Sequence, residues 1–134
     1  MRVKGNPLDV KFSHVEYEKD GKKFYKTIAR CEVGWSNVPE LIYGTYFDMF
    51  SKVGYMGDVV NLYAETVCKP EDTFDPKKGE RIARKKIMKK FMSQVRQASE
   101  KRLETLCREW NELEEMYQDA SKSIDKILAY LQSE

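Results

Sequence analysis

Residues 67–83 read VCKPEDTFDPKKGERIA, and this stretch separates a strand-rich first half of the chain from a helical second half. Pro70 is typical of a tight turn that leads out of a strand. Asp75 suits a helix N-cap, because its carboxylate can accept hydrogen bonds from the free N–H groups of the first turn. Pro76 suits the first helical position, where its missing N–H is not needed. The stretch therefore predicts that a strand ends at residue 68 and that a helix begins at residue 76.

Gly79 is unusual within the first turn of this predicted helix. Glycine costs about 1 kcal/mol in a helix relative to alanine, so its presence calls for a reason. A missing side chain allows a close approach to the backbone, either by an anionic ligand at the helix N-terminus or by a neighbouring strand. Both interpretations are open on the sequence alone.

The chain before the turn predicts a small antiparallel sheet over residues 8–68. Asp20-Gly21 indicates a two-residue type I′ turn within a β-hairpin of residues 8–33. With Lys19 opposite Lys22, Tyr17 faces Phe24 across the hairpin. Residues 58–68 alternate as a further strand, with their apolar side chains on one face.

An aromatic-rich connection, residues 34–57, links the hairpin to that further strand, and residues 45–52 are predicted to form a short helix. Its aromatic residues either wrap the sheet and close the core or form a stacking surface for bases or a partner protein. They are Trp35, Tyr43, Tyr46, Phe47, Phe50 and Tyr55.

Residues 76–132 predict a long helical region. Its first part has an apolar stripe formed by Ile82, Ile87, Met88, Phe91, Val95 and Ala98. From residue 103 the apolar residues recur in alternating steps of three and four, which is typical of a coiled coil. We call this set the seam: Leu103, Leu106, Trp110, Leu113, Tyr117, Ala120, Ile124, Ile127 and Leu131. The stripe and the seam are out of phase by one residue, so the region is either one helix with a stutter or two helices with a break near residues 97–101.

A seam of this kind needs a partner. It either docks on the chain's own sheet or joins protomers, and so small a sheet favours a homo-oligomer, with residues 76–132 as the oligomerisation region. The predicted contact residues are Leu103, Leu106, Trp110, Leu113, Tyr117, Ile124 and Ile127.

The net charge of +2 hides a strong asymmetry. Residues 76–102 carry 11 Lys/Arg and 2 Asp/Glu, whereas residues 103–134 carry 3 and 8. The basic segment either binds the phosphates of a small nucleotide, or lies along nucleic acid, or is a solvated face that pairs with the acidic segment. For the nucleotide interpretation, the phosphate-binding candidates are Lys78, Arg81, Arg84 and Lys85. Phe74 and Tyr43 are the candidates for stacking a base, and Gly79 for close approach of the ligand.

The composition argues against several other classes of protein. No nucleotide-binding loop, metalloprotease motif or nucleophile elbow occurs, so we do not expect an enzyme. The single histidine, His14, lies in a predicted strand, where a structural role is favoured. Cys31, Cys68 and Cys107 lie far apart, which predicts free thiols, no metal site and no cofactor. The N-terminus lacks the apolar core of a signal peptide, and no apolar run has the length of a membrane span. We therefore expect a cytoplasmic protein.

The residues around the turn resemble a pattern of small bacteriophage proteins: Cys68-x-Pro70-x-Asp72-x-Phe74-Asp75, then Gly79, then Ile82-Ala83. The family that residues 58–92 resemble is the phage-encoded Thoeris anti-defence sponges, and the rest of the chain is similar in layout. The resemblance implies an N-terminal antiparallel sheet followed by two C-terminal helices. It also implies a dimer or hexamer that sequesters a cyclic nucleotide signal, such as a cyclic ADP-ribose isomer or a cyclic oligonucleotide, without cleaving it in the host bacterial cytosol. No ligand residue is carried over, and the long seam departs from the family's short helices.

The sequence thus predicts one α+β domain over residues 1–134. The expected function is sequestration of a cyclic nucleotide. The alternatives are a nucleic-acid-binding or host-protein-binding factor that uses residues 76–102, and a structural coiled-coil assembly protein.

Overall fold

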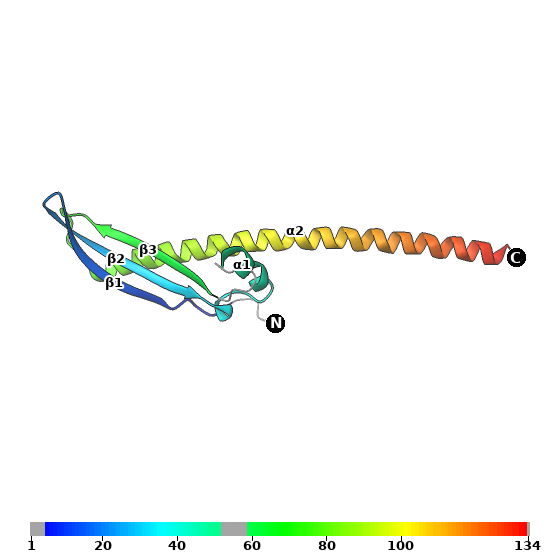
Figure 1. The fold of residues 1–134 in the computed structure, drawn as a ribbon, viewed down its shortest axis with the longest axis horizontal. Helices are drawn as coiled ribbons and strands as arrows, with labels where there is room; N and C mark the ends of the chain where they lie inside the picture. The colour runs from blue at the N-terminus through cyan, green and yellow to red at the C-terminus, as the bar shows by residue number, and fades with distance from the viewer. Residues whose placement is uncertain (1–4, 52–58, 134) are drawn as a thin grey trace. The chain divides into compact units, whose positions relative to one another are not determined.

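The computed structural model describes residues 5–51 and 59–133. The described residues include an N-terminal hairpin of two long strands, β1 (Val10–Lys19) and β2 (Lys22–Val33) (Figure 1). Asp20 and Gly21 connect the strands with φ angles of 54° and 74°, which is the left-handed backbone of a type I′ turn. Tyr17 pairs with Phe24, and their rings stack at a centroid distance of 5.5 Å. The predicted turn and register are therefore confirmed.

A third strand, β3 (Val60–Cys68), pairs antiparallel with β2 and completes a sheet of order β1-β2-β3. The predicted start of this strand at Asp58 lies outside the described residues. Lys69 then accepts a backbone hydrogen bond from Asp72 at 3.0 Å, which closes the turn predicted at Pro70. With the long helix α2 (Pro76–Gln132) that follows, the fold is α+β, as expected.

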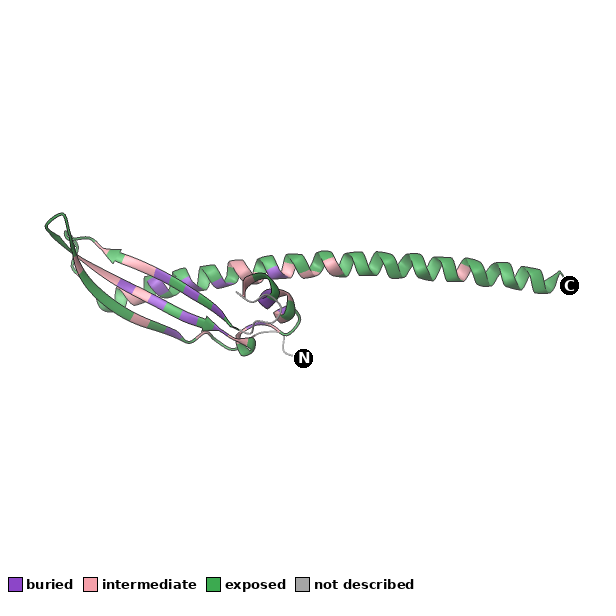
Figure 2. Ribbon diagram, in the orientation of Figure 1, coloured by how far each residue is buried: buried purple, intermediate pink, exposed green. Residues whose placement is uncertain are grey.

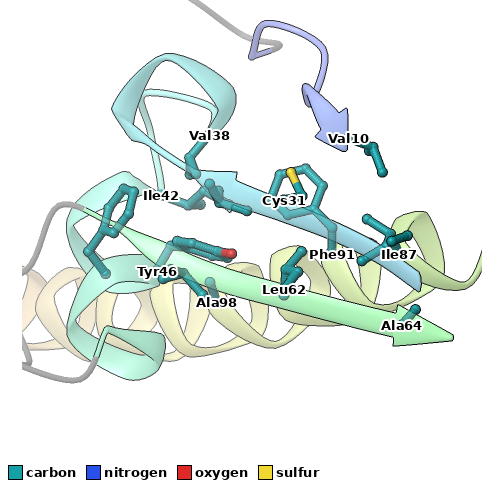
Figure 3. Packing of buried hydrophobic residues seen from close by; sticks show 14 of the residues in the cluster. Val10, Cys31, Val38, Ile42, Tyr46, Leu62, Ala64, Ile87, Phe91 and Ala98 are labelled. Carbon is teal, nitrogen blue, oxygen red and sulfur yellow. The ribbon is translucent and has the colours of Figure 1, made fainter. Parts of the chain in front are cut away.

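The core lies between one face of the sheet and the first part of α2 (Figures 2 and 3). The strands contribute alternate side chains to the core. α2 contributes one side chain every one or two turns. The buried apolar residues are Val10, Ala29, Cys31, Val33, Val60, Leu62 and Ala64 on the strands and Ala83, Ile87, Phe91 and Ala98 on α2.

The predicted apolar stripe of α2 was wrong at two positions. Ile82 and Met88 are each 38% exposed, whereas Ala83, which the prediction omitted, is fully buried. At 3.6 residues per turn, residues 83, 87 and 91 follow one line on the helix surface, and Ile82 and Met88 lie on either side of it. The small alanine on that line allows the helix to approach the sheet closely.

Between β2 and β3 lie a short 3₁₀ helix, η1 (Trp35–Asn37), and α1 (Tyr43–Phe50). The helix predicted at residues 45–52 thus begins two residues earlier, and Lys52 lies outside the described residues, as does Tyr55. Tyr46 of α1 is 0% exposed and closes one end of the core (Figure 3). The next residue, Phe47, is 1% exposed and belongs to the same core. The described part of the connection therefore wraps the core.

The Tyr46 hydroxyl is tied to α2, because it donates a hydrogen bond to Gln94 Oε1 at 2.6 Å. Burial raises the pKa of Tyr46 well above its usual value, so the phenol stays neutral and keeps this proton.

α2 is one unbroken helix from Pro76 to Gln132, with no break at residues 97–101. Of the two alternatives for this region, the structure therefore has the single helix and not two helices with a break. Contacts divide the chain into two compact units, Met1–Ser99 and Glu100–Glu134. The prediction that residues 1–134 form one domain remains a prediction. No helix within 5–51 and 59–133 combines the length and apolar character needed to cross a membrane.

In the second unit the large seam side chains are exposed in the single chain (Figure 2). Their exposed fractions run from 43% for Leu106 to 69% for Trp110. A helix face this apolar and this exposed is typical of an interaction surface.

Candidate functional site

The connection from β3 to α2 and the first turn of α2 surround a pocket of about 350 Å³. The start of α2 beside this pocket is fixed by its N-cap. Asp75 Oδ1 accepts hydrogen bonds from the backbone N–H groups of Lys77 at 3.1 Å and Lys78 at 3.4 Å. The predicted cap is therefore confirmed. The pocket is lined by Thr27, Thr66, Val67, Cys68, Asp72, Thr73, Phe74, Asp75, Lys78, Gly79 and Ile82.

Three of the seven predicted ligand residues line this pocket: Phe74, Lys78 and Gly79. Because Asp75 occupies two of the N-terminal N–H groups, its carboxylate already offsets the positive end of the helix dipole. An anion here would depend on side-chain cations such as Lys78 more than on the helix end itself.

Gly79 packs directly against the buried Thr27 of β2. A Cβ at residue 79 would lie 2.3 Å from Thr27 Oγ1 and 3.2 Å from Thr27 Cβ. Real Cβ atoms do not approach other heavy atoms so closely. Of the two interpretations of this glycine, the structure thus supports close approach by a neighbouring strand. The missing side chain allows α2 to pack directly on the sheet.

We expect Gly79→Ala to lower the free energy of unfolding by about 1–3 kcal/mol, measured by urea denaturation, because overpacking outweighs the gain in helix propensity. Thr27 is 1% exposed and has little room to move. Gly44→Ala is the matched control, since this helical glycine in α1 has no atom within 4 Å of an added Cβ. It should be neutral or slightly stabilising. Equal effects of the two substitutions would contradict the packing argument.

Aromatic and polar side chains hold Phe74 in place beside the pocket. Its ring stacks on Tyr25 at 4.6 Å and meets the edge of the His14 ring at 5.7 Å. His14 Nδ1 lies 3.0 Å from Thr27 Oγ1, and its Nε2 lies 3.5 Å from Glu80 Oε2. His14 therefore links β1, β2 and the first turn of α2, which is the structural role favoured from the sequence.

These neighbours of Phe74 were missed by sequence reasoning. The available signal was Gly79, because a glycine in the first helical turn marks a strand close enough to bring its side chains to the helix start.

The four predicted phosphate ligands do not converge on one point. Lys78 lines the pocket, whereas the Arg84 guanidinium lies over the Phe12 ring of β1 at 5.1 Å. Arg81 and Lys85 are exposed and do not line the pocket. At 100° per residue, positions 78, 81, 84 and 85 fall within an arc of about 120° on α2, but Lys78 alone of the four lines the pocket.

Two further lysines of α2 bind the sheet itself. Lys86 Nζ donates to the backbone carbonyl of Glu65 at 2.8 Å, and Lys90 Nζ donates to the carbonyl of Tyr63. Both carbonyls belong to β3, an edge strand of the sheet. Two of the basic side chains thus donate hydrogen bonds to backbone carbonyls of the sheet. The sequence signal for this role was the i, i+4 spacing of the two lysines on a helix that follows an edge strand.

Tyr43 lies at the opposite end of the sheet from Phe74. It packs against Trp35 at 4.2 Å, and Trp35 follows the end of β2 at Val33. Phe74 stacks on Tyr25, eight residues earlier in β2, which is about 26 Å of strand. The Tyr43 and Phe74 rings therefore do not flank one base. Of the two residues predicted to stack a base, only Phe74 lines the pocket.

The seven predicted oligomerisation residues share one face of α2 in the second unit, by their spacing of three and four along a continuous helix. They form a second candidate surface, separate in sequence from the pocket.

The three cysteines are free thiols: Cys31 is buried, Cys68 half-buried and Cys107 exposed. No group of three or more His, Cys, Asp or Glu side chains within the described ranges could hold a metal ion. Comparison of the chain with protein-family models, with curated proteins and with solved structures finds no match.

Proposed function

We propose that this protein binds a cyclic nucleotide signal in the host cytosol and holds it without cleaving it. The observation that carries the proposal is the pocket at the start of α2, where Phe74, Lys78 and Gly79 lie together. Its volume of about 350 Å³ falls at the lower end of the range of small-molecule sites, which is about 300–1,000 Å³.

Lys78, the hydroxyls and the aromatic ring of the pocket suit a phosphorylated ligand, whereas the carboxylates of Asp72 and Asp75, which also line it, oppose an anion. Lys78 supplies an exposed ammonium group, Thr66 and Thr73 supply hydroxyls, and Phe74 supplies an aromatic surface. Arg81 and Lys85, exposed nearby on α2, add positive potential that attracts anions. Asp75 is engaged as the helix cap, which supports a structural rather than an acid–base role for its carboxylate.

Calorimetry with a panel of cyclic nucleotides and cyclic ADP-ribose isomers tests the proposal. We expect one ligand to bind, and Lys78→Glu to weaken it at least tenfold, because the reversal places a negative charge beside a phosphate. Lys126→Glu, the same change on the second unit, is the control and should leave the affinity unchanged.

The fate of the ligand is read by heating the complex and analysing the released molecule by mass spectrometry. Release of the intact cyclic compound supports sequestration. A linear product, or no binding by any member of the panel, would contradict the proposal.

We also propose that the protein is a homo-oligomer assembled through the seam. This part rests on the exposure of the seam side chains in the single chain. Burial of a large apolar side chain contributes about 1.5–3 kcal/mol, so covering several of them provides ample driving force for association.

A second candidate function is nucleic-acid binding, favoured by the exposed cations of α2 that do not line the pocket, including Arg81, Lys85 and Lys89. None of Arg81, Arg84 and Lys85 takes part in the four ion pairs of residues 5–51 and 59–133. Binding of a duplex probe that falls steeply as salt rises, together with failure to bind cyclic nucleotides, would favour this function.

A further inference from the structure

We propose that the seam pairs with the seam of a second copy in antiparallel orientation, so that Trp110 packs against the partner's Ala120. The inference deepens the proposed assembly and rests on it. It follows from the sizes of the seam residues, from the charges beside them, and from the continuity and exposure of the helix that carries them.

The seam holds one very large and one very small residue, Trp110 and Ala120. In a parallel pair in register each residue meets its own copy. Tryptophan would then face tryptophan, and alanine would face alanine three layers further on. Such a pair is too wide at one layer and leaves a cavity at the other, and both defects are destabilising.

An antiparallel pair centred on Glu115 removes this mismatch. Trp110 then lies opposite the partner's Ala120, and Leu113 lies opposite the partner's Tyr117. The outer layers join leucine with isoleucine: Leu106 with the partner's Ile124, and Leu103 with the partner's Ile127. All eight seam residues from 103 to 127 find an apolar partner, and no layer joins two bulky aromatic residues.

The charges beside the seam favour the same orientation. In the heptad that the seam defines, Glu109 and Glu114 occupy the flanking g and e positions. A parallel pair in register places Glu109 beside the partner's Glu114 on both sides, which gives two repulsive contacts. In the antiparallel pair Glu109 lies beside the partner's Ser123, and only one repulsive contact remains, between the two copies of Glu114.

The length of the contact is adequate. Residues 103–127 of α2 span about 36 Å at 1.5 Å per residue, which is three and a half heptads and enough for a stable coiled coil. Shifting the antiparallel pair by one heptad places Trp110 opposite the partner's Ile127 and leaves Leu103 without an apolar partner. The register centred on Glu115 alone joins the largest seam residue to the smallest.

Disulfide cross-linking of the full chain tests orientation and register together. In a Cys107→Ser background, Leu106→Cys and Ile124→Cys are made as separate proteins, purified alone and after co-expression, and oxidised. We expect a covalent dimer only from the co-expressed pair. The background protein by itself should give none, since Cys31 is buried and Cys68 is half-buried.

Other patterns overturn the pairing. A parallel pair cross-links each variant by itself. An antiparallel pair shifted by one heptad cross-links co-expressed Leu113→Cys and Ile124→Cys, but does not cross-link Leu106→Cys with Ile124→Cys. A monomer in sedimentation overturns the assembly as well, whereas nucleotide binding is read separately by calorimetry.

Exchange of the two residues provides an independent test. Trp110→Ala and Ala120→Trp should each lower the melting temperature of the assembly, by a cavity and by overpacking respectively. The double variant rebuilds the same layer with its members exchanged and should recover most of the loss. A double variant at least as unstable as the sum of the single losses would overturn the pairing.

Discussion

Replacement of Phe91 with alanine should lower the free energy of unfolding by about 3–5 kcal/mol. The Phe91 ring is 7% exposed and lies between α2 and the sheet, with its centroid 6.0 Å from that of Tyr46 (Figure 3). A loss of this size is a large part of the stability of a small domain.

Urea denaturation followed through Trp35 fluorescence, in a Trp110→Phe background that removes the second tryptophan, measures this loss. Trp35 stacks on Phe47 at 5.1 Å, so its emission reports on the same core. Met92→Ala is the matched control, because Met92 is the next residue of the helix and is 53% exposed. The control should change the free energy by less than about 0.5 kcal/mol. Similar losses for the two variants would mean that α2 does not pack on the sheet along the line of residues 83, 87 and 91.

Replacement of Trp110 with aspartate should abolish the proposed assembly through the seam. The change removes the largest apolar side chain of the seam, which is 69% exposed in the single chain, and places a carboxylate in an apolar layer. Burying an unpaired charge costs several kcal/mol, which corresponds to more than a thousandfold in the association constant. Sedimentation equilibrium measures the change directly.

The control for this variant is Asn111→Asp, which adds the same charge one residue away, outside the seam. It should leave the oligomer intact. The urea midpoint for unfolding of the first unit should be the same in both variants, since the first unit does not contain the change. An oligomer that survives Trp110→Asp would show that assembly uses another surface.

Local signals in the sequence predicted much of the fold. Asp20-Gly21 specified a type I′ turn, and this turn set the register in which Tyr17 faces Phe24. Asp75 and Pro76 specified the start of α2. Each of these features depends on residues within a few positions of one another, so the physical rule could be applied without knowledge of the tertiary structure.

The candidate site was harder to predict, because it depends on distances between elements. Phe74 and Tyr43 both suit a stacking role by composition, but the length of β2 separates them. Lys86 and Lys90 were counted with the basic face, although the edge of β3 lies within their reach. Only the packing of α2 on the sheet decides which cations are free for a ligand.

The two lysines on β3 have a further consequence for the life of the protein in a crowded cell. An edge strand with free carbonyl groups is a template on which strands from other molecules can add, and repeated addition builds fibrils. Lys86 and Lys90 occupy two carbonyls of β3 and place positive charges along it. Acetylation of both lysines would remove the charges and weaken these bonds, so we expect it to leave this edge less protected against the addition of other strands.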